Sequence, residues 1–304
     1  MNKREITIVT VNWYSTDFLV PLLRNLGDKA VLPENLSVLV VDNTNGEDKS
    51  LEQLNESPMN MQVLKHDSRD MKSSKAHAAA LDYAMPHIQT PYCLIIDPDV
   101  YVFKQHWDEF CLAELKTNGS IAIGAPYPGW KLGKYHDFPS PVFCFFDTHK
   151  VRDLNTPWTP FGYSALYNVW ICLIRQIARL GFLMTRRNYE RIFLLQQYAS
   201  AIEKAFGTFS QDTGWRIALA ARRKKIRSIV FTVASNRDAV RVPSSARKAF
   251  GGLAGEYELY CFQDTVILTH KYGTGVRLWR TKRGADQAYW FECIRQMELS
   301  RNDS

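Results

Sequence analysis

The sequence predicts an α/β fold in which strands alternate with crossover helices along a parallel sheet. Apolar runs typical of buried strands recur through the first third of the chain, and segments with helix character separate them. Two of these runs end in carboxylates, Asp42 in one case and Asp97 with Asp99 in the other. Such alternation favours a parallel sheet, and ligands bind outside the carboxyl ends of strands in sheets of this kind.

The predicted strands are short and rich in β-branched residues. The first covers Glu5–Asn12 (EITIVTVN) and the second Leu36–Val41 (LSVLVV). A third is expected at Met61–Leu64, and a fourth begins the stretch Tyr92–Phe103 (YCLIIDPDVYVF). Runs of this length and composition favour strands over helices.

The segments between the strands have helix signals. Ser15 can cap a helix for which Gly27 is a stop signal. A weaker helix is expected at Ser50–Glu56, and the alanine-rich segment Ser73–Met85 predicts another. Further on, we expect short strands near 119–126 and 141–147, and a long basic loop from Asn236 to Gly255.

Composition sets limits on the class of protein. A hydrophobic content of 46% supports a packed core, and a net charge of +7 with a pI near 9.0 favours phosphate-bearing partners. None of the six cysteines forms a Cys-x-x-Cys pair, and several lie in apolar runs, so we expect reduced core thiols and a cytoplasmic protein. The sequence contains no signal-peptide pattern and no uncharged window long enough to span a membrane.

The Asp97-Pro98-Asp99 triplet is the strongest chemical signal. Two carboxylates one residue apart at a strand end offer hard oxygen ligands, which suit Mg²⁺ or Mn²⁺ held together with substrate phosphates. The same triplet is also a common turn sequence. No Gly-x-Gly-x-x-Gly follows the first strand and no Walker-type loop occurs, so dinucleotide oxidoreduction and P-loop phosphoryl transfer lose support.

Four motifs together resemble one known family. They are VTVNWYS after the first strand, VVDN at 40–43, the alanine-rich helix at 75–84 and LIIDPDV at 94–100. In order and spacing they are similar to the nucleotide-sugar domain of inverting family 2 glycosyltransferases. Within that family they most resemble the group that acts on bacterial surface polysaccharides, including rhamnosyltransferase-like members. The resemblance implies the GT-A fold, a Rossmann-like mixed sheet with helices on both faces. It also implies a donor half at 1–125, an acceptor half at 126–285 and a tail at 286–304.

The resemblance assigns roles to the donor side. Val11, Asn12 and Trp13 would line the base and ribose, and Asp42 would bind the nucleoside. Asp97 would contact the ribose or diphosphate, and Asp99 would hold the metal.

Two residues of the alanine-rich helix stand where the family usually has Asn and Gly. Lys75 and His77 occupy these positions, and a donor contact and a solvated helix face both stay open for them. A late histidine, His270, would complete the metal shell, although a lone histidine is often structural.

The glycines at 273 and 275 would let the backbone approach the diphosphate closely. Lys271 or Arg277 would help neutralise its charge.

The acceptor half carries three further signals. A loop rich in Gly, Pro and aromatic residues holds Trp130, Tyr135 and His136, which would either offer ring faces to a sugar or pack into a turn. The segment 161–206 predicts a helical insertion that is amphipathic and basic, and membrane or partner contact and core packing both stay open. In QDTGWR, Asp212 resembles the family's catalytic base, with a helix N-cap as the alternative.

These signals predict a metal-dependent inverting transferase. Its donor would be a UDP-, dTDP- or GDP-linked sugar, and its acceptor a hydroxyl of a glycan or a lipid-linked molecule. The expected setting is surface polysaccharide biosynthesis in the cytoplasm, with peripheral contact to the inner face of the plasma membrane. Alternatives are a degenerate GT-A module that binds without turnover and a nucleotidyltransferase, which usually has a Gly-rich loop absent here. The scattered basic residues match no nucleic-acid motif.

Overall fold

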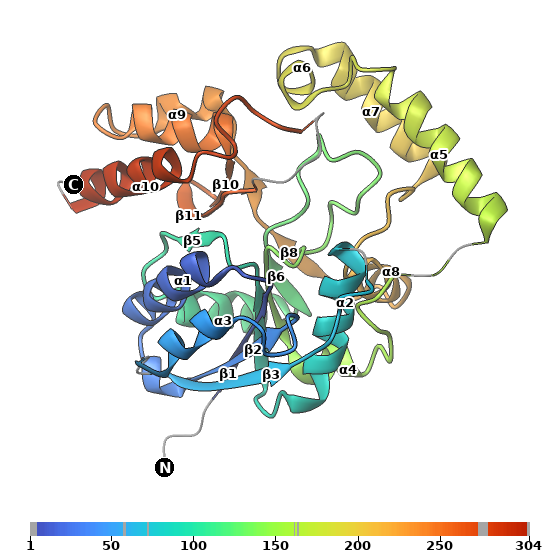
Figure 1. Ribbon diagram of the computed structural model, residues 1–304. Helices are drawn as coiled ribbons and strands as arrows, with labels where there is room; N and C mark the ends of the chain where they lie inside the picture. Colours follow the sequence, from blue (N-terminus) through green and yellow to red (C-terminus); the bar gives the residue numbers. More distant parts are fainter. Residues whose placement is uncertain are drawn as a thin grey trace. The chain divides into compact units, whose positions relative to one another are not determined.

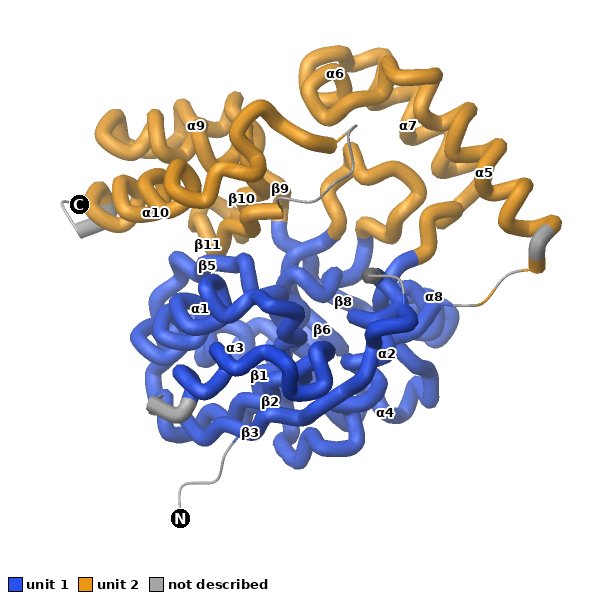
Figure 2. The backbone as a smooth tube through the Cα atoms, viewed as in Figure 1, with its two compact units in different colours: residues 1–126, 137–160, 212–231 blue, residues 127–136, 161–211, 232–304 orange. Residues whose placement is uncertain are grey.

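The computed structural model describes residues 5–56, 59–71, 73–160, 162, 164–272 and 279–302. The chain divides into two compact units (Figure 2). Unit 1 holds residues 1–126, 137–160 and 212–231, and unit 2 holds 127–136, 161–211 and 232–304. The chain therefore passes between the units several times. The donor half at 1–125 and the acceptor half at 126–285 stay predictions.

Unit 1 is built on a seven-stranded mixed sheet with the order β3-β2-β1-β4-β7-β6-β8. Figure 1 labels β1, β2, β3, β6 and β8 of this sheet. The pairs β1–β2, β2–β3, β1–β4 and β6–β8 are parallel, and β7 is antiparallel to both β4 and β6. The expected α/β class with a mixed sheet is confirmed. The strands are β1 (Ile6–Asn12), β2 (Leu36–Asp42), β3 (Asn60–Lys65), β4 (Tyr92–Ile96), β6 (Ala122–Gly124), β7 (Phe143–Asp147) and β8 (Ser228–Val230), and the short β5 (Val100–Val102) follows β4.

The helices of unit 1 connect these strands. They are α1 (Thr16–Lys29), α2 (Ser73–Ala84), α3 (Trp107–Asn118), α4 (Thr148–Arg152) and α8 (Trp215–Arg223), with 3-10 turns η1 (Pro33–Asn35), η2 (Lys49–Glu56) and η3 (Met85–His87). The crossover through α1 leads from β1 to β2, and the crossover through α2 leads from β3 back past β1 to β4. Because parallel crossovers are right-handed, these opposite directions put α1 and α2 on opposite faces of the sheet.

The core of unit 1 lies along the central strands. Every residue of β1 is buried, and β2 and β4 are buried almost throughout. Aromatic side chains fill the region around β7, where the Trp107 ring packs edge-on against Phe143 and Phe145. In the outer strand β3 most side chains are exposed or half-buried, and Val63 is exposed, as expected for a strand paired on one side.

Unit 2 combines a small antiparallel sheet with helices. Its strands β9 (Thr232–Val233), β10 (Glu258–Phe262) and β11 (Thr265–His270) pair in the order β9-β10-β11. Its helices are α5 (Ala165–Arg179), α6 (Arg186–Arg191), α7 (Phe193–Phe206), α9 (Arg247–Glu256) and α10 (Gln287–Asn302), and η4 (Asn236–Arg241) precedes α9. The helical insertion expected at 161–206 is thus present as α5, α6 and α7.

Several local expectations are corrected. Helix α1 continues through Gly27 to Lys29, because Gly27 is buried on the inner face of the helix and has helical neighbours on both sides. The segment 236–255 is not a loop but contains η4 and most of α9. The expected tail is the helix α10, which is anchored by the buried side chains of Trp290 and Met297.

The thiols also depart from expectation at one position. Cys93, Cys111, Cys144 and Cys293 are buried and Cys261 is half-buried, but Cys172 on α5 is exposed. The apolar run around Cys172 is helical and packs along only one face, so this residue does not enter the core.

Two glycines of unit 1 provide a matched test of packing. At Gly27 a Cβ atom would lie 3.8 Å from the Met59 sulfur, an ordinary contact, whereas at Gly124 it would lie 1.9 Å from the Phe143 carbonyl oxygen. We expect Gly27→Ala to stabilise the protein by about 0.5–1 kcal/mol, since it removes helix-interior glycine. Gly124→Ala should destabilise it by more than about 2 kcal/mol through the forced strand separation.

Urea unfolding followed by circular dichroism measures both effects. Equal stability of the two variants would contradict the described packing of α1 and β6.

Candidate active site

The order of the strands creates a switch point in the sheet. Connections leave β1 toward β2 on one side and reach β4 on the other, so the loops at the carboxyl ends of these two adjacent strands diverge. In open α/β sheets the crevice at such a point is where ligands bind. Asn12 ends β1, and Asp97 directly follows β4. Asn12 and Asp97, two of the donor residues that the sequence predicted, therefore lie at this edge.

Asn12 organises the loops on the β1 side. Its buried side-chain amide donates to Asp48 at 2.9 Å and to Asp42 at 3.4 Å, and its oxygen accepts from the Ser15 backbone N–H at 3.0 Å. Burial raises the pKa of Asp48, but hydrogen bonds from Ser50, Asn12 and Thr16 outweigh that effect and lower it overall. Asn12 thus links the start of α1 to the loop after β2.

Asp42 is committed to the same loop. One oxygen accepts from the Thr44 backbone and hydroxyl at 3.1 and 2.7 Å, and the other accepts from the Gly46 N–H at 2.7 Å. The side chain is 1% exposed. In this structure Asp42 therefore holds the loop after β2 from within.

Exposed aromatic rings stand at the end of β1. Val11 is buried in the sheet, but Trp13 is 50% exposed and packs edge-on against Tyr14, which is 58% exposed. The Tyr14 hydroxyl donates to Glu47 at 3.2 Å, and this contact together with partial desolvation raises the pKa of Tyr14. Sequence reasoning included Trp13 and overlooked Tyr14, although its place within NWYS was a usable signal.

His77 on α2 pairs with the metal motif. Its Nε2 lies 3.3 Å from an Asp97 carboxylate oxygen, and both side chains are 24% exposed. Burial lowers the pKa of His77, but the hydrogen bond and charge of Asp97 and the charge of Asp212 outweigh it, so the pKa is raised. The negative charges of Asp97 and Asp212 therefore both act on His77. Lys75, two residues earlier, is exposed.

Asp212 lies in the turn before α8. Gly214, with a left-handed φ of 83°, is the N-cap residue of α8, so the N-cap alternative for Asp212 does not apply. The Asp212 carboxylate accepts from the Thr213 N–H at 2.9 Å. The Thr213 hydroxyl in turn donates to the Ser74 carbonyl at 3.2 Å, which fixes this turn to the first residues of α2.

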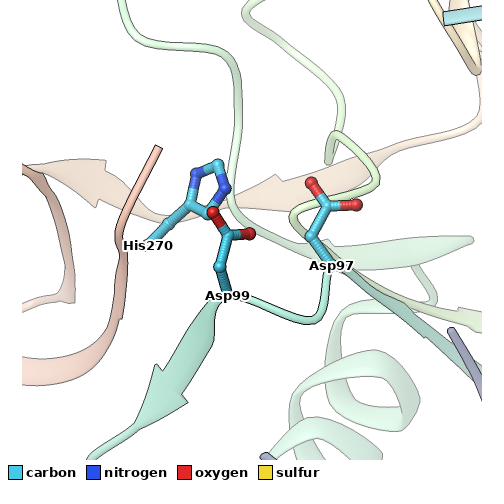
Figure 3. Close-up of side chains that lie close together, drawn as sticks. All are labelled: Asp97, Asp99 and His270. Atoms are coloured by element: carbon cyan, nitrogen blue, oxygen red, sulfur yellow. The ribbon is translucent and has the colours of Figure 1, made fainter. Parts of the chain in front are cut away.

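The metal candidates Asp97, Asp99 and His270 lie close together. One carboxylate oxygen of each aspartate and one ring nitrogen of His270 fall within 4.8 Å of one another (Figure 3). Two carboxylates and a neutral imidazole form a donor set that Mn²⁺ accepts, and the carboxylates also suit Mg²⁺. The residues present therefore fit a divalent cation.

A buried polar network in unit 2 orients His270. The antiparallel register places Glu258 of β10 opposite His270 of β11, and the His270 Nδ1 lies 2.9 Å from a Glu258 oxygen. Lys131 Nζ lies 2.6 Å from the other oxygen, and the Tyr260 hydroxyl donates to Glu258 at 2.9 Å. Lys131 and Glu258 are almost fully buried.

This network holds a proton on Nδ1 of His270. Burial alone would raise the pKa of Glu258, but the charges and hydrogen bonds of Lys131 and His270 outweigh it and hold the pKa well below its usual range. An ionised carboxylate only accepts hydrogen bonds, so Nδ1 of His270 carries a proton and donates it to Glu258. Sequence reasoning missed Glu258 and Lys131. The polar Glu258 among the apolar residues of β10 was the available signal.

The acceptor-side candidates are largely packed. Trp130 is 7% exposed and lies under the Arg186 guanidinium at 4.3 Å. Tyr135 is 1% exposed and packs edge-on against Tyr127. His136 bonds the Tyr127 carbonyl through Nδ1 and Glu203 through Nε2 at 3.0 Å. These contacts match the packed-turn alternative that the sequence left open.

Three predicted residues cannot be placed. Gly273, Gly275 and Arg277 lie outside the described residues.

Among solved structures the chain is similar to known glycosyltransferases at low identity. PcManGT, the mannosyltransferase from Pyrobaculum calidifontis in complex with GDP-Man and Mn2+, is 12% identical, with a TM-score of 0.42 over 74% of this chain and 81% of that one. S. aureus TarS 1-349 in complex with UDP-GlcNAc is 13% identical, with a TM-score of 0.42 over 98% of this chain and 92% of that one. At this level of similarity no residue role is carried over from either protein. No family model and no curated protein matches the chain.

The network around His270 gives a stability prediction. Glu258→Gln leaves Lys131 buried without its counter-charge, so we expect a loss of about 3–5 kcal/mol in the free energy of unfolding. Glu203 forms a partly exposed pair with His136 and also accepts from the Gly133 N–H at 2.7 Å, a bond that the amide oxygen of glutamine can keep, so Glu203→Gln should cost no more than about 1 kcal/mol. Chemical denaturation of both variants tests the contrast, and a Glu258→Gln variant as stable as the Glu203→Gln control would refute it.

Proposed function

We propose that the chain is a metal-dependent inverting glycosyltransferase that uses a nucleoside-diphosphate sugar. The observation that carries this proposal is the grouping of His270 with Asp97 and Asp99, the two aspartates that follow β4 at the strand edge where α/β sheets bind ligands. Asp99 and His270 would hold the cation, and Asp97, paired with His77, would contact the ribose or diphosphate. The cation would supply charge neutralisation for the departing diphosphate.

The nucleoside would lie at the end of β1. The exposed rings of Trp13 and Tyr14 offer faces for the base, beside the loop that Asn12 and Asp42 hold rigid. Val11, two residues before Trp13, is buried in the sheet and would support this end of β1. Lys75 is exposed on the first turn of α2, so its ammonium is free to approach a phosphate.

Asp212 would act as the general base. Inversion needs a single carboxylate that takes the proton from the acceptor hydroxyl as that hydroxyl attacks opposite the leaving group. The bonds from Thr213 to the Asp212 carboxylate and to Ser74 hold this turn, and the charge of Asp212 is felt by His77. No covalent nucleophile is required for this reaction.

The acceptor would be a hydroxyl of a glycan or of a lipid-linked molecule. This rests on the sequence resemblance to enzymes of surface polysaccharide synthesis, which also motivates a cytoplasmic site of action at the inner membrane face. Within the described residues no helix is both long and apolar enough to cross a membrane.

Substitution of the two key carboxylates tests the chemistry. Asp212→Asn should lower kcat by about 10²–10⁴-fold, because the amide cannot take a proton. Asp99→Asn should lower activity strongly and raise the Mn²⁺ concentration needed for half-maximal rate, because a charged ligand is lost.

Asp137→Asn is the control, since the Asp137 side chain is exposed and pairs with Arg222 at the surface. Each variant is assayed for sugar transfer and for thermal unfolding. Near-normal transfer by a folded Asp99 or Asp212 variant would remove that residue's assigned role.

Nucleotide binding separates an enzyme from a module without turnover. We expect UDP, GDP or dTDP to raise the unfolding temperature in the presence of Mn²⁺, because a ligand that binds only the folded state stabilises it. The shift should depend on the metal and disappear in Asp99→Asn. A metal-dependent shift without transfer or donor hydrolysis would indicate a degenerate module, and no shift with any of the three would refute the donor assignment.

A further inference from the structure

Helix α5 presents an apolar face that no other described element covers. Leu166, Val169, Leu173 and Ile177 recur at spacings of three and four residues, which places them on one side of the helix. Each is at least half exposed, and Leu166 reaches 84%.

The core side of α5 is a different face. Ile171, Ile174 and Ala178 are buried there, and they cluster with Leu195 and Ala199 of α7. The helix is therefore apolar on two faces, and only one of them contributes to folding of unit 2. An uncovered apolar face of this extent marks an interaction surface.

Further exposed apolar side chains lie just before and just after α6. Phe182 and Leu183, in the turn after α5, are 79% and 50% exposed, and Phe193 and Leu194, at the start of α7, are 66% and 72% exposed. We call these four residues, together with the exposed face of α5, the α5–α7 apolar surface. Most of the large apolar side chains that this structure exposes belong to it or adjoin it.

Most of the charged side chains around this surface are positive. Arg187 and Arg191 of α6 are exposed, and Arg175 and Arg179 of α5 are half-exposed. Glu190 is the one acidic residue from 161 to 202, and it is engaged by Arg186 at 2.9 Å. The surface thus joins exposed apolar and aromatic groups to cationic groups without exposed anionic neighbours.

We propose that the α5–α7 apolar surface docks on an anionic lipid bilayer. Apolar and aromatic side chains enter the interface while arginines contact the headgroup phosphates, which is how amphipathic helices bind membranes peripherally. The proposal concerns this surface alone and does not depend on the assigned reaction.

Charge distinguishes a bilayer from a second copy of the chain. A two-fold dimer through this surface would bring the same patch of each copy together. The arginines of both copies would then lie in one interface, where they outnumber the acidic residues, and this is unfavourable. Anionic headgroups instead neutralise them.

Vesicle co-sedimentation tests the proposal. The full chain is mixed with phosphatidylcholine vesicles, either pure or containing about one-third phosphatidylglycerol. We expect binding to the anionic vesicles that weakens with salt. The triple variant Phe182→Ser/Phe193→Ser/Leu194→Ser should lose about tenfold or more in partitioning, and Arg187→Gln/Arg191→Gln should lose the preference for phosphatidylglycerol.

A matched control removes exposed apolar groups elsewhere. Leu32→Ser/Val240→Ser/Leu299→Ser changes three exposed side chains outside this surface and should leave vesicle binding unchanged. Thermal unfolding verifies that each variant is folded. The proposal is overturned if the wild-type chain does not bind anionic vesicles at low salt, or if the surface variant binds them as well as the control does. It is also overturned if light scattering detects a dimer of the wild-type chain and the only effect of the surface variant is to dissociate that dimer.

Discussion

The divergence of the chain at the carboxyl ends of β1 and β4 is the constraint on which the candidate site depends. Neighbouring parallel strands whose connections run in opposite directions leave an open edge that neither crossover can fill. Residues that follow these strands must therefore turn away from the sheet within a few positions. Asn12 achieves this on one side by bonding to Asp48 and Ser15, and Asp97 begins the turn on the other.

Buried polar bonds then make this edge rigid. The side chains of Asp42 and Asn12 form hydrogen bonds within the protein, so the backbone around them is already held in place without a ligand. Glu258 does the same for His270 in unit 2, where Lys131 balances its charge. Ligand-binding geometry that is prepared in advance costs less ordering on binding.

Much of the fold could be predicted from the sequence, because the spacing and the type of apolar residues indicate which positions are buried. The β-branched runs at Ile6–Asn12 and Leu36–Asp42 lie within central strands, and their patterns left little choice. Partners distant in sequence could not be read in the same way. The pairings of His77 with Asp97 and of Glu258 with Lys131 join residues from separate elements, so only the folded chain brings them together. Trp130 and Tyr135 show the converse, since aromatic residues in a Gly-Pro loop suit both a ligand and a core.

The distribution of the thiols gives the chain a built-in chemical handle. Burial raises the pKa of Cys93 and Cys111 well above the usual value and raises that of Cys261 to about 11, so few of these groups are thiolate at neutral pH. Alkylating reagents attack the thiolate and need access to it. Exposed Cys172 is therefore the position at which a maleimide dye would attach first, and such a dye on α5 would report on the surroundings of that helix without any engineered residue.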